Sequence, residues 1–236
     1  MSPFIGEFIG TTLLTLLGGG VVANVVLNNT KGHNAGWIVV TFGWSMAVFV
    51  GVYASVHLGG SGHLNPASTI ALAVFGDFKA ELVAPYLAAQ FLGAFTGAVL
   101  AWITYKSHFD KTDNADIKLA VFATSPAERK PLYNFLAELI GTFVLLLGAL
   151  VISKPSGSMG ALDALPVGFL VFAIGLSLGG PTGYAINPAR DLAPRFAHFI
   201  LPIKNKRDSD WSYAWIPVVA PIAGALLAAA LYNVIR

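Results

Sequence analysis

The sequence lacks cysteine altogether and is poor in charged residues. The absence of cysteine among 236 residues excludes disulfides, thiolate metal sites and a cysteine nucleophile. The five histidines are scattered without metal-ligand spacing, and no acid, base and nucleophile gather in one motif. The residues therefore indicate neither an enzyme nor a metal centre. A net charge of +2 is too small to indicate nucleic-acid binding.

Hydrophobic residues dominate the sequence instead. Hydrophobic residues make up 56% of the sequence and charged residues 11%, against about 25% charged in a typical soluble domain. The mean hydropathy is +0.70. This composition predicts an integral membrane protein, in contact with lipid along most of its length.

Six stretches are long enough to span a hydrocarbon core, which takes about 20 residues. In chain order they are residues 4–27, 37–58, 82–105, 132–152, 164–178 with its flanks, and 212–235. The longest polar connection, residues 106–131, separates two halves, 1–105 and 132–236. We therefore expect an all-α membrane protein with a single membrane domain over residues 1–236.

One tripeptide occurs twice, as Asn65-Pro66-Ala67 and as Asn187-Pro188-Ala189. In each copy Asn precedes Pro, which is typical of an N-cap followed by the first helical residue. Each copy opens a short apolar run, 68–75 or 192–199, that cannot cross a bilayer. The pattern predicts two half-helices that enter the membrane and stop inside it.

The two halves of the chain repeat each other. Glu7 and Glu138 stand in matching Glu-x-x-Gly-Thr segments 131 positions apart, and the two Asn-Pro-Ala copies are 122 positions apart. Three spans in each half put the second half upside down relative to the first. Interrupted helices at corresponding places of such an inverted repeat indicate the functional centre.

The two half-helices are expected to meet at their N-terminal ends near the middle of the membrane. Their dipoles then add a positive potential there, while the Asn side chains cap the helices and keep amide hydrogens for a lumen. The preceding residues are expected to be extended and to offer backbone carbonyls as acceptors. These are Ser61, Gly62, His63, Gly183 and Ala185. Such a path suits neutral molecules with hydroxyl groups; the alternative is two Asn caps without a lumen.

With these motifs the chain resembles the major intrinsic protein family, the aquaporins and glycerol facilitators, over essentially its full length. The paired Asn-Pro-Ala motifs, the Glu-x-x-Gly-Thr segments and Asn187-Pro-Ala-Arg-Asp191 carry the resemblance. It implies a passive channel, a homotetramer, and neither cofactor nor metal. It also implies that Glu7 and Glu138 are structural, accepting hydrogen bonds from the backbone of the two re-entrant loops. A local ion pair is the expected role of Asp191 and Arg195, four positions apart.

The resemblance also implies a narrow selectivity filter of four residues. These are Trp44, Gly175, Tyr184 and Arg190. A shifted alignment of the second span brings in Phe42 or Ser45 in place of Trp44.

This filter resembles that of the glycerol-conducting branch. Two aromatic faces suit an alkyl backbone, and Arg190 donates to hydroxyl groups opposite them. Gly175 leaves room for a solute larger than water. Tyr184 departs from the Phe that is common there, and we expect its hydroxyl to tighten the pore or change its preference.

The sequence thus predicts facilitated diffusion of glycerol, water and other small neutral solutes, with urea, dihydroxyacetone and protonated lactic acid as further candidates. A water-selective channel is the first alternative. A coupled secondary transporter is the second, because inverted repeats and broken helices also occur there. Coupling needs ionisable groups at the centre, and Arg190 is the only charge that the sequence places near it.

The resemblance implies a bacterial cell-membrane protein with cytoplasmic termini, but the loop charges favour the opposite orientation. With cytoplasmic termini, three basic residues face inward, and they are Lys79, Lys154 and Arg236. Apart from Arg190 and Arg195, nine face outward, and they are Lys31, Lys106, Lys111, Lys118, Arg129, Lys130, Lys204, Lys206 and Arg207. We give the motifs more weight than the charge bias.

Overall fold

The computed structural model describes residues 2–152 and 157–236, and within these ranges the chain forms helices and no strands. Lys154, one of the three inward basic residues expected above, lies outside the described residues. Six helices are long and apolar enough to cross a membrane. They are α1 (Pro3–Val26), α2 (Trp37–His57), α4 (Val83–Lys111), α6 (Pro131–Val151), α7 (Leu165–Leu178) and α9 (Ile216–Ile235), with 3-10 turns Ala80–Leu82 and Gly160–Ala164 before α4 and α7. The all-α prediction with six spans is confirmed.

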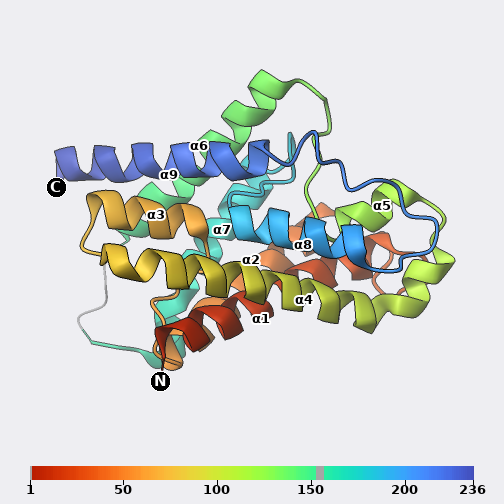
Figure 1. Ribbon diagram of the computed structural model, residues 1–236, viewed down its shortest axis with the longest axis horizontal. Coiled ribbons are helices and arrows are strands. Elements are labelled where there is room, and N and C mark those ends of the chain that lie inside the picture. The colour runs from red at the N-terminus through yellow and green to blue at the C-terminus, as the bar shows by residue number, and fades with distance from the viewer. Residues whose placement is uncertain (1, 153–156) are drawn as a thin grey trace.

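Two shorter helices, α3 (Pro66–Phe75) and α8 (Pro188–Ile200), lie end to end across the middle of the molecule (Figure 1). Each packs against the last helix of the other half, α3 against α9 and α8 against α4. The long helices follow the same rule in both halves, because α1 packs on α2 and α4 as α6 packs on α7 and α9. The predicted half-helices and the repeat of the two halves therefore appear together in the packing.

Glycines allow the closest of these helix contacts. A Cβ atom added to Gly93 of α4 would lie 2.4 Å from the carbonyl oxygen of Phe8 in α1. In the second half, a Cβ atom added to Gly224 of α9 would lie 2.2 Å from the carbonyl oxygen of Leu139 in α6. No side chain fits at either distance. Small residues at such positions let membrane helices approach closely where lipid supplies no hydrophobic drive between them.

The third membrane helix ends six residues later than the sequence analysis predicted, because α4 continues beyond residue 105 to Lys111. Its polar last turns are stabilised by an ion pair between Lys106 and Asp110, one turn apart. Thr112 then ends the helix, where its hydroxyl accepts a hydrogen bond from the backbone N–H of Asn28 at 2.9 Å. Hydropathy alone does not reveal a helix that projects out of the apolar layer.

Two further features differ from the prediction, the polar connection 106–131 and the start of the last span. The first contains a short helix, α5 (Ala115–Ala120), whose N-cap Asn114 accepts hydrogen bonds from two backbone N–H groups. The last membrane helix begins at Ile216 and not at residue 212. Asp210 holds the preceding turns by accepting a hydrogen bond from the Ser212 hydroxyl at 3.1 Å, and Pro217 fixes the first helical turn.

Candidate functional site

The two asparagines of the repeated tripeptide cap the two half-helices. Oδ1 of Asn65 accepts a hydrogen bond from the backbone N–H of Ala67 at 3.0 Å. Oδ1 of Asn187 accepts the matching bond from Ala189 at 3.0 Å and a second from Arg190 at 3.2 Å. Both helices therefore begin where the Asn-Pro pattern indicates, with their N-terminal ends at the centre of the molecule.

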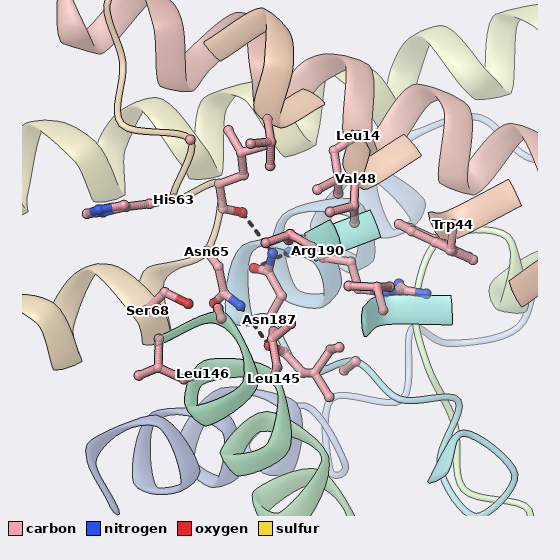
Figure 2. Close-up of a pocket in the computed structure, with 18 of the residues that line it drawn as sticks. Leu14, Trp44, Val48, His63, Asn65, Ser68, Leu145, Leu146, Asn187 and Arg190 are labelled. Atoms are coloured by element: carbon pink, nitrogen blue, oxygen red, sulfur yellow. Dashed lines mark hydrogen bonds between the residues drawn. The ribbon is translucent and has the colours of Figure 1, made fainter. Parts of the chain in front are cut away.

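Each capping asparagine also reaches across to the opposite loop. Nδ2 of Asn65 donates to the carbonyl oxygen of Ile186, and Nδ2 of Asn187 donates to that of Leu64, both at 2.8 Å. Figure 2 shows the two side chains next to each other with these bonds as dashed lines. One N–H of each amide therefore joins the two halves, and the second N–H remains available to donate into the cavity.

Sequence reasoning missed Leu64 and Ile186, although both directly precede an asparagine and stand 122 positions apart. Both have left-handed backbone conformations, with φ of 49° for Leu64 and 45° for Ile186. For a β-branched residue such as isoleucine this conformation is strained. The strain accompanies the geometry that aims each carbonyl at the asparagine of the other half.

Glu7 holds the first re-entrant loop from inside the protein. Its side chain is fully buried and accepts backbone N–H bonds from His63 at 3.0 Å and Leu64 at 2.8 Å. Ser55 and Gln90 donate to the same carboxylate at 3.0 and 2.8 Å. Gln90 was not among the expected site residues; its only sequence signal is a polar side chain in an uncharged apolar span.

Glu138 holds the second loop in the same way. It is fully buried and accepts backbone N–H bonds from Ala185 at 2.9 Å and Ile186 at 2.8 Å. The hydroxyl of Thr182 adds a third bond at 2.6 Å. The contacts of both glutamates are thus the loop backbone contacts that the sequence resemblance implied for them.

These bonds also orient the carbonyl groups of the loops. In a trans peptide the C=O of one residue points opposite to the N–H of the next. Because the N–H groups of His63 and Ala185 point at the glutamates, the carbonyls of Gly62 and Tyr184 point away from them. By the same reasoning the carbonyls of His63 and Ala185 point away as well. Gly62, His63, Tyr184 and Ala185 all line the central cavity.

The central cavity has a volume of about 170 Å³ and contains both capping asparagines on its wall. Aliphatic side chains from the long helices form much of the remaining wall, among them Leu14, Val48 and Val171. A second cavity of about 850 Å³ lies beyond it and is lined by Gly183. Ser61, whose backbone carbonyl was expected to be an acceptor in the lumen, lines neither cavity, and its hydroxyl bonds to that of Tyr86 at 2.9 Å.

Three of the four expected filter residues stand where the two cavities meet. Trp44, Tyr184 and Arg190 line both cavities. The guanidinium carbon of Arg190 lies 4.1 Å from the centre of the Trp44 ring, and Figure 2 shows the two side chains together. Phe42, an alternative to Trp44, is 48% exposed, whereas Ser45 is buried with its hydroxyl donating to the carbonyl of Gly168 at 2.8 Å.

Gly175 does not line either cavity. A Cβ atom added to it would lie 3.0 Å from Cζ of Tyr184 and 2.9 Å from Cγ2 of Thr41. The room that the sequence analysis assigned to a solute is therefore filled by the ring of Tyr184. The Tyr184 hydroxyl is buried, and in the described part of the chain its oxygen has no hydrogen-bond partner.

Arg190 sets the electrostatics of the constriction. Its side chain is 8% exposed, and among the described residues no hydrogen bond or ion pair involves its guanidinium group. Among the described residues, no other one that lines the two cavities is an Asp, Glu, Lys or Arg. A fixed cation whose N–H donors are free to bind a solute repels cations and offers hydrogen bonds to neutral hydroxyl groups.

A buried ion pair fixes the half-helix that carries Arg190. Asp191 and Arg195 are both fully buried, with Nη2 of Arg195 2.7 Å from Oδ1 of Asp191, as the sequence spacing indicated. Asp191 also accepts the backbone N–H and the hydroxyl of Thr124 at 2.7 and 2.6 Å. Arg195 donates to the carbonyls of Ser209 and Thr124 at 2.8 and 2.9 Å. The pair therefore ties α8 to the connection 106–131 through Thr124 and to the segment before α9 through Ser209.

Comparisons with known proteins agree with this geometry. The family model described as Major intrinsic protein matches residues 1–232. A probable glycerol uptake facilitator protein of Thermotoga maritima is 58% identical over 99% of both chains. Glycerol uptake facilitator protein 3 of Lactiplantibacillus plantarum is 51% identical over 98% of this chain and 95% of its own. The structure of the aquaglyceroporin from Plasmodium falciparum superposes with a TM-score of 0.86 at 34% identity, covering 99% of this chain and 95% of that one.

Proposed function

This chain belongs to the major intrinsic protein family, and from that premise we propose that it is a passive channel for the diffusion of glycerol across a membrane. It is a multi-pass membrane protein and not an enzyme. We propose that residues 1–236 form one channel domain, with the two Asn-Pro-Ala motifs at its centre and Trp44, Tyr184 and Arg190 at its filter.

The mixed lining of the central cavity is the observation that carries this function. Aliphatic side chains of α1, α2, α6 and α7 form the apolar part of the lining, where the carbon backbone of glycerol loses little by leaving water. The capping asparagines, the loop carbonyls and Arg190 form the polar part and supply both donors and acceptors. A polyol can exchange its hydration for these groups, whereas a cation meets Arg190 and two positive helix ends.

Flux measurements on proteoliposomes test the proposal. Glycerol added outside the vesicles should enter at a rate proportional to its concentration gradient, without saturation, and collapsing ion gradients should leave that rate unchanged. Protein-free vesicles are the control. Vesicles that conduct water but exclude glycerol favour the water-selective alternative, and glycerol flux that needs an ion gradient favours a coupled transporter.

Water, urea, dihydroxyacetone and protonated lactic acid are proposed as further solutes, because each is small and can be neutral. A charged form is excluded by the cost of desolvating an ion in so narrow a site. Lactic acid provides the sharpest comparison, since its flux should fall as the pH rises above its pKa while glycerol flux stays constant. Equal lactate flux at both pH values contradicts this part of the proposal.

We propose a homotetramer in a bacterial cell membrane with cytoplasmic termini, following the family resemblance. The outward basic residues that oppose this orientation are largely engaged by protein groups. Lys106, Arg129 and Arg207 pair with carboxylates, while Lys118 and Lys206 donate to backbone carbonyls. Burial lowers the pKa of both these lysines. The proposed orientation therefore rests on the family resemblance, against the positive-inside bias of the loops.

Two measurements test the assembly and the orientation. The protein can be extracted from the membrane in lipid nanodiscs by a polymer, without detergent. The protein mass of each particle, after the lipid and polymer are subtracted, should equal the mass of four chains. A protease added to intact cells should leave a terminal tag uncut and should cleave it only after the cells are opened. Cleavage from outside overturns the proposed orientation.

A further inference from the structure

The ring of Tyr184 packs against the end of α7, where two glycines leave room for it. A Cβ atom added to Gly175 would lie 3.0 Å from Cζ of this ring, and one added to Gly179 would lie 2.5 Å from its Cδ1. Ordinary carbon–carbon contacts lie at about 3.5–4.0 Å. Gly175 and Gly179, four positions apart, therefore form a slot that accepts the ring only because both lack a side chain.

Trp37, the first residue of α2, forms another side of this slot. Its ring meets the Tyr184 ring edge to face, with centroids 5.8 Å apart and planes at 82°. Its Nε1 donates to the carbonyl oxygen of Gly175 at 3.0 Å, which joins α2 to α7 at this level. A Cβ atom added to Gly179 would also lie 2.9 Å from Cζ2 of Trp37, so Trp37 blocks that direction.

The backbone gives the Tyr184 ring little freedom to move elsewhere. Tyr184 has a left-handed conformation with φ of 39°, which is rare for a bulky residue. The N–H of Gly183 donates to the carbonyl of Gly179 at 2.8 Å, and the N–H of Ala185 is held by Glu138. With both neighbours fixed, the open direction for the ring is the cavity in front of Arg190, which Tyr184 lines.

We propose that Gly179 and Trp37 are positioning residues that set the width of the filter by holding the Tyr184 ring back from Arg190. The proposal rests on the proposed function, because it says how the constriction admits glycerol. Neither residue lines the central cavity; both line the second cavity. A methyl group on Gly179 would displace the ring by roughly 1 Å to restore a normal contact. That displacement narrows the filter.

The substitution Gly179→Ala tests this in the full chain reconstituted in proteoliposomes. Glycerol permeability should fall about tenfold, the rate equivalent of a typical overpacking penalty, while water permeability falls less because water is narrower. The ratio of the two permeabilities is the readout, since a fold defect lowers both alike. Gly180→Ala is the matched control, because a Cβ atom there meets nothing within 4 Å.

A variant that lacks the Tyr184 ring distinguishes the effect of the ring from any effect on the end of α7. A Cβ atom on Gly179 would also lie 2.6 Å from the carbonyl oxygen of Gly175, whatever stands at position 184. In a Tyr184→Ala background, Gly179→Ala should therefore change the glycerol-to-water ratio by less than about twofold, because the coupling between the two sites is gone. Equal fold changes in both backgrounds overturn the proposal.

Trp37→Ala probes the other side of the slot. It frees the ring to move away from Arg190, so permeability to erythritol, one carbon longer than glycerol, should rise. An unchanged erythritol flux removes Trp37 from the proposal. A wild-type protein that conducts no glycerol contradicts the proposed function itself, whereas a conducting wild type with Gly179→Ala equal to Gly180→Ala contradicts only this inference.

Discussion

The two re-entrant loops share one scaffold and differ at the positions that face the solute. Glu7 and Glu138 hold them through the same two backbone N–H groups in each loop. At the offset of 122 residues that relates the asparagines, Gly62 corresponds to Tyr184 and Ser68 to Arg190, and all four line the central cavity. Where the second half has the ring of Tyr184, the first half has Gly62, which has no side chain. Where the second half has the cation of Arg190, the first has the small hydroxyl of Ser68.

The difference shows that folding and selectivity are separate demands on a repeated structure. Bracing by a buried glutamate and capping by an asparagine have to be present twice, because each half-helix needs them. A constriction is needed at only one place along the path, since a single filter is enough to select the solute. The positions that repeat are therefore structural, and those that do not repeat are where selectivity is expected.

The largest effect should come from the pair that only the second loop has. Thr69 of the first half corresponds to Asp191, so Asp191→Thr imposes the first half's residue and leaves Arg195 buried without its partner. Breaking a buried ion pair in this way costs about 3–5 kcal/mol. The thermal unfolding midpoint in detergent should fall sharply. Asp116→Asn, which breaks an exposed pair with Arg207, is the control and should cost less than about 1 kcal/mol.

A smaller and equal effect is expected at the two glutamates. Glu7→Gln and Glu138→Gln each replace one carboxylate oxygen, which accepts hydrogen bonds, by an amide NH₂ group, which donates them. The buried groups that donated to that oxygen are then left unpaired. Each should cost about 2–3 kcal/mol, read from the same unfolding midpoint. Glu81→Gln, on the surface, is the control. If one variant is tolerated and the other is not, the two loops are not equivalent and the comparison fails.

Much of this scaffold could be predicted from the sequence because its signals are local and occur twice. Asn before Pro marks both half-helices, and a Glu-x-x-Gly-Thr segment marks each bracing glutamate. Hydropathy locates the six spans but not their ends, since the last turns of α4 depend on Lys106 and Asp110, which read as loop. The role of Gln90 could not be predicted, because it depends on a contact with Glu7, 83 positions away.

The filter was harder to predict because its shape depends on packing between distant helices. The family resemblance assigns Arg190 and Tyr184 to the filter through their places in the second re-entrant loop. It does not reveal that the Tyr184 ring fills the space beside Gly175, nor that Trp44 stacks on Arg190. A glycine that makes room for a solute and a glycine that makes room for a side chain look the same in a sequence. Only the three-dimensional neighbours, such as Thr41 and Gly179, distinguish the two.

Replacing the cation should have a clear but smaller effect than breaking the scaffold. Arg190→Ser imposes the residue that the first loop has at the matched position. Proton leak into proteoliposomes, followed with a pH-sensitive dye, should rise about tenfold, because the fixed charge contributes on the order of 1.4 kcal/mol to the barrier. Ser68→Ala should leave the leak unchanged. An unchanged leak in Arg190→Ser means that the helix ends and the two asparagines exclude protons without the cation.

The smallest effect should come from the hydroxyl of Tyr184, because the ring and not the hydroxyl distinguishes this loop from the first. The oxygen is buried without a partner in the described part of the chain, so Tyr184→Phe removes an unsatisfied polar group. The protein should become more stable by about 1 kcal/mol, which raises the unfolding midpoint by about 2–4 °C. The sequence alone led us to expect that this hydroxyl tightens the pore or changes its preference; with the hydroxyl buried, glycerol permeability should instead stay within about twofold of wild type, because the ring keeps its slot between Gly175 and Gly179. A large loss of glycerol flux without a loss of stability shows instead that the hydroxyl takes part in selecting the solute.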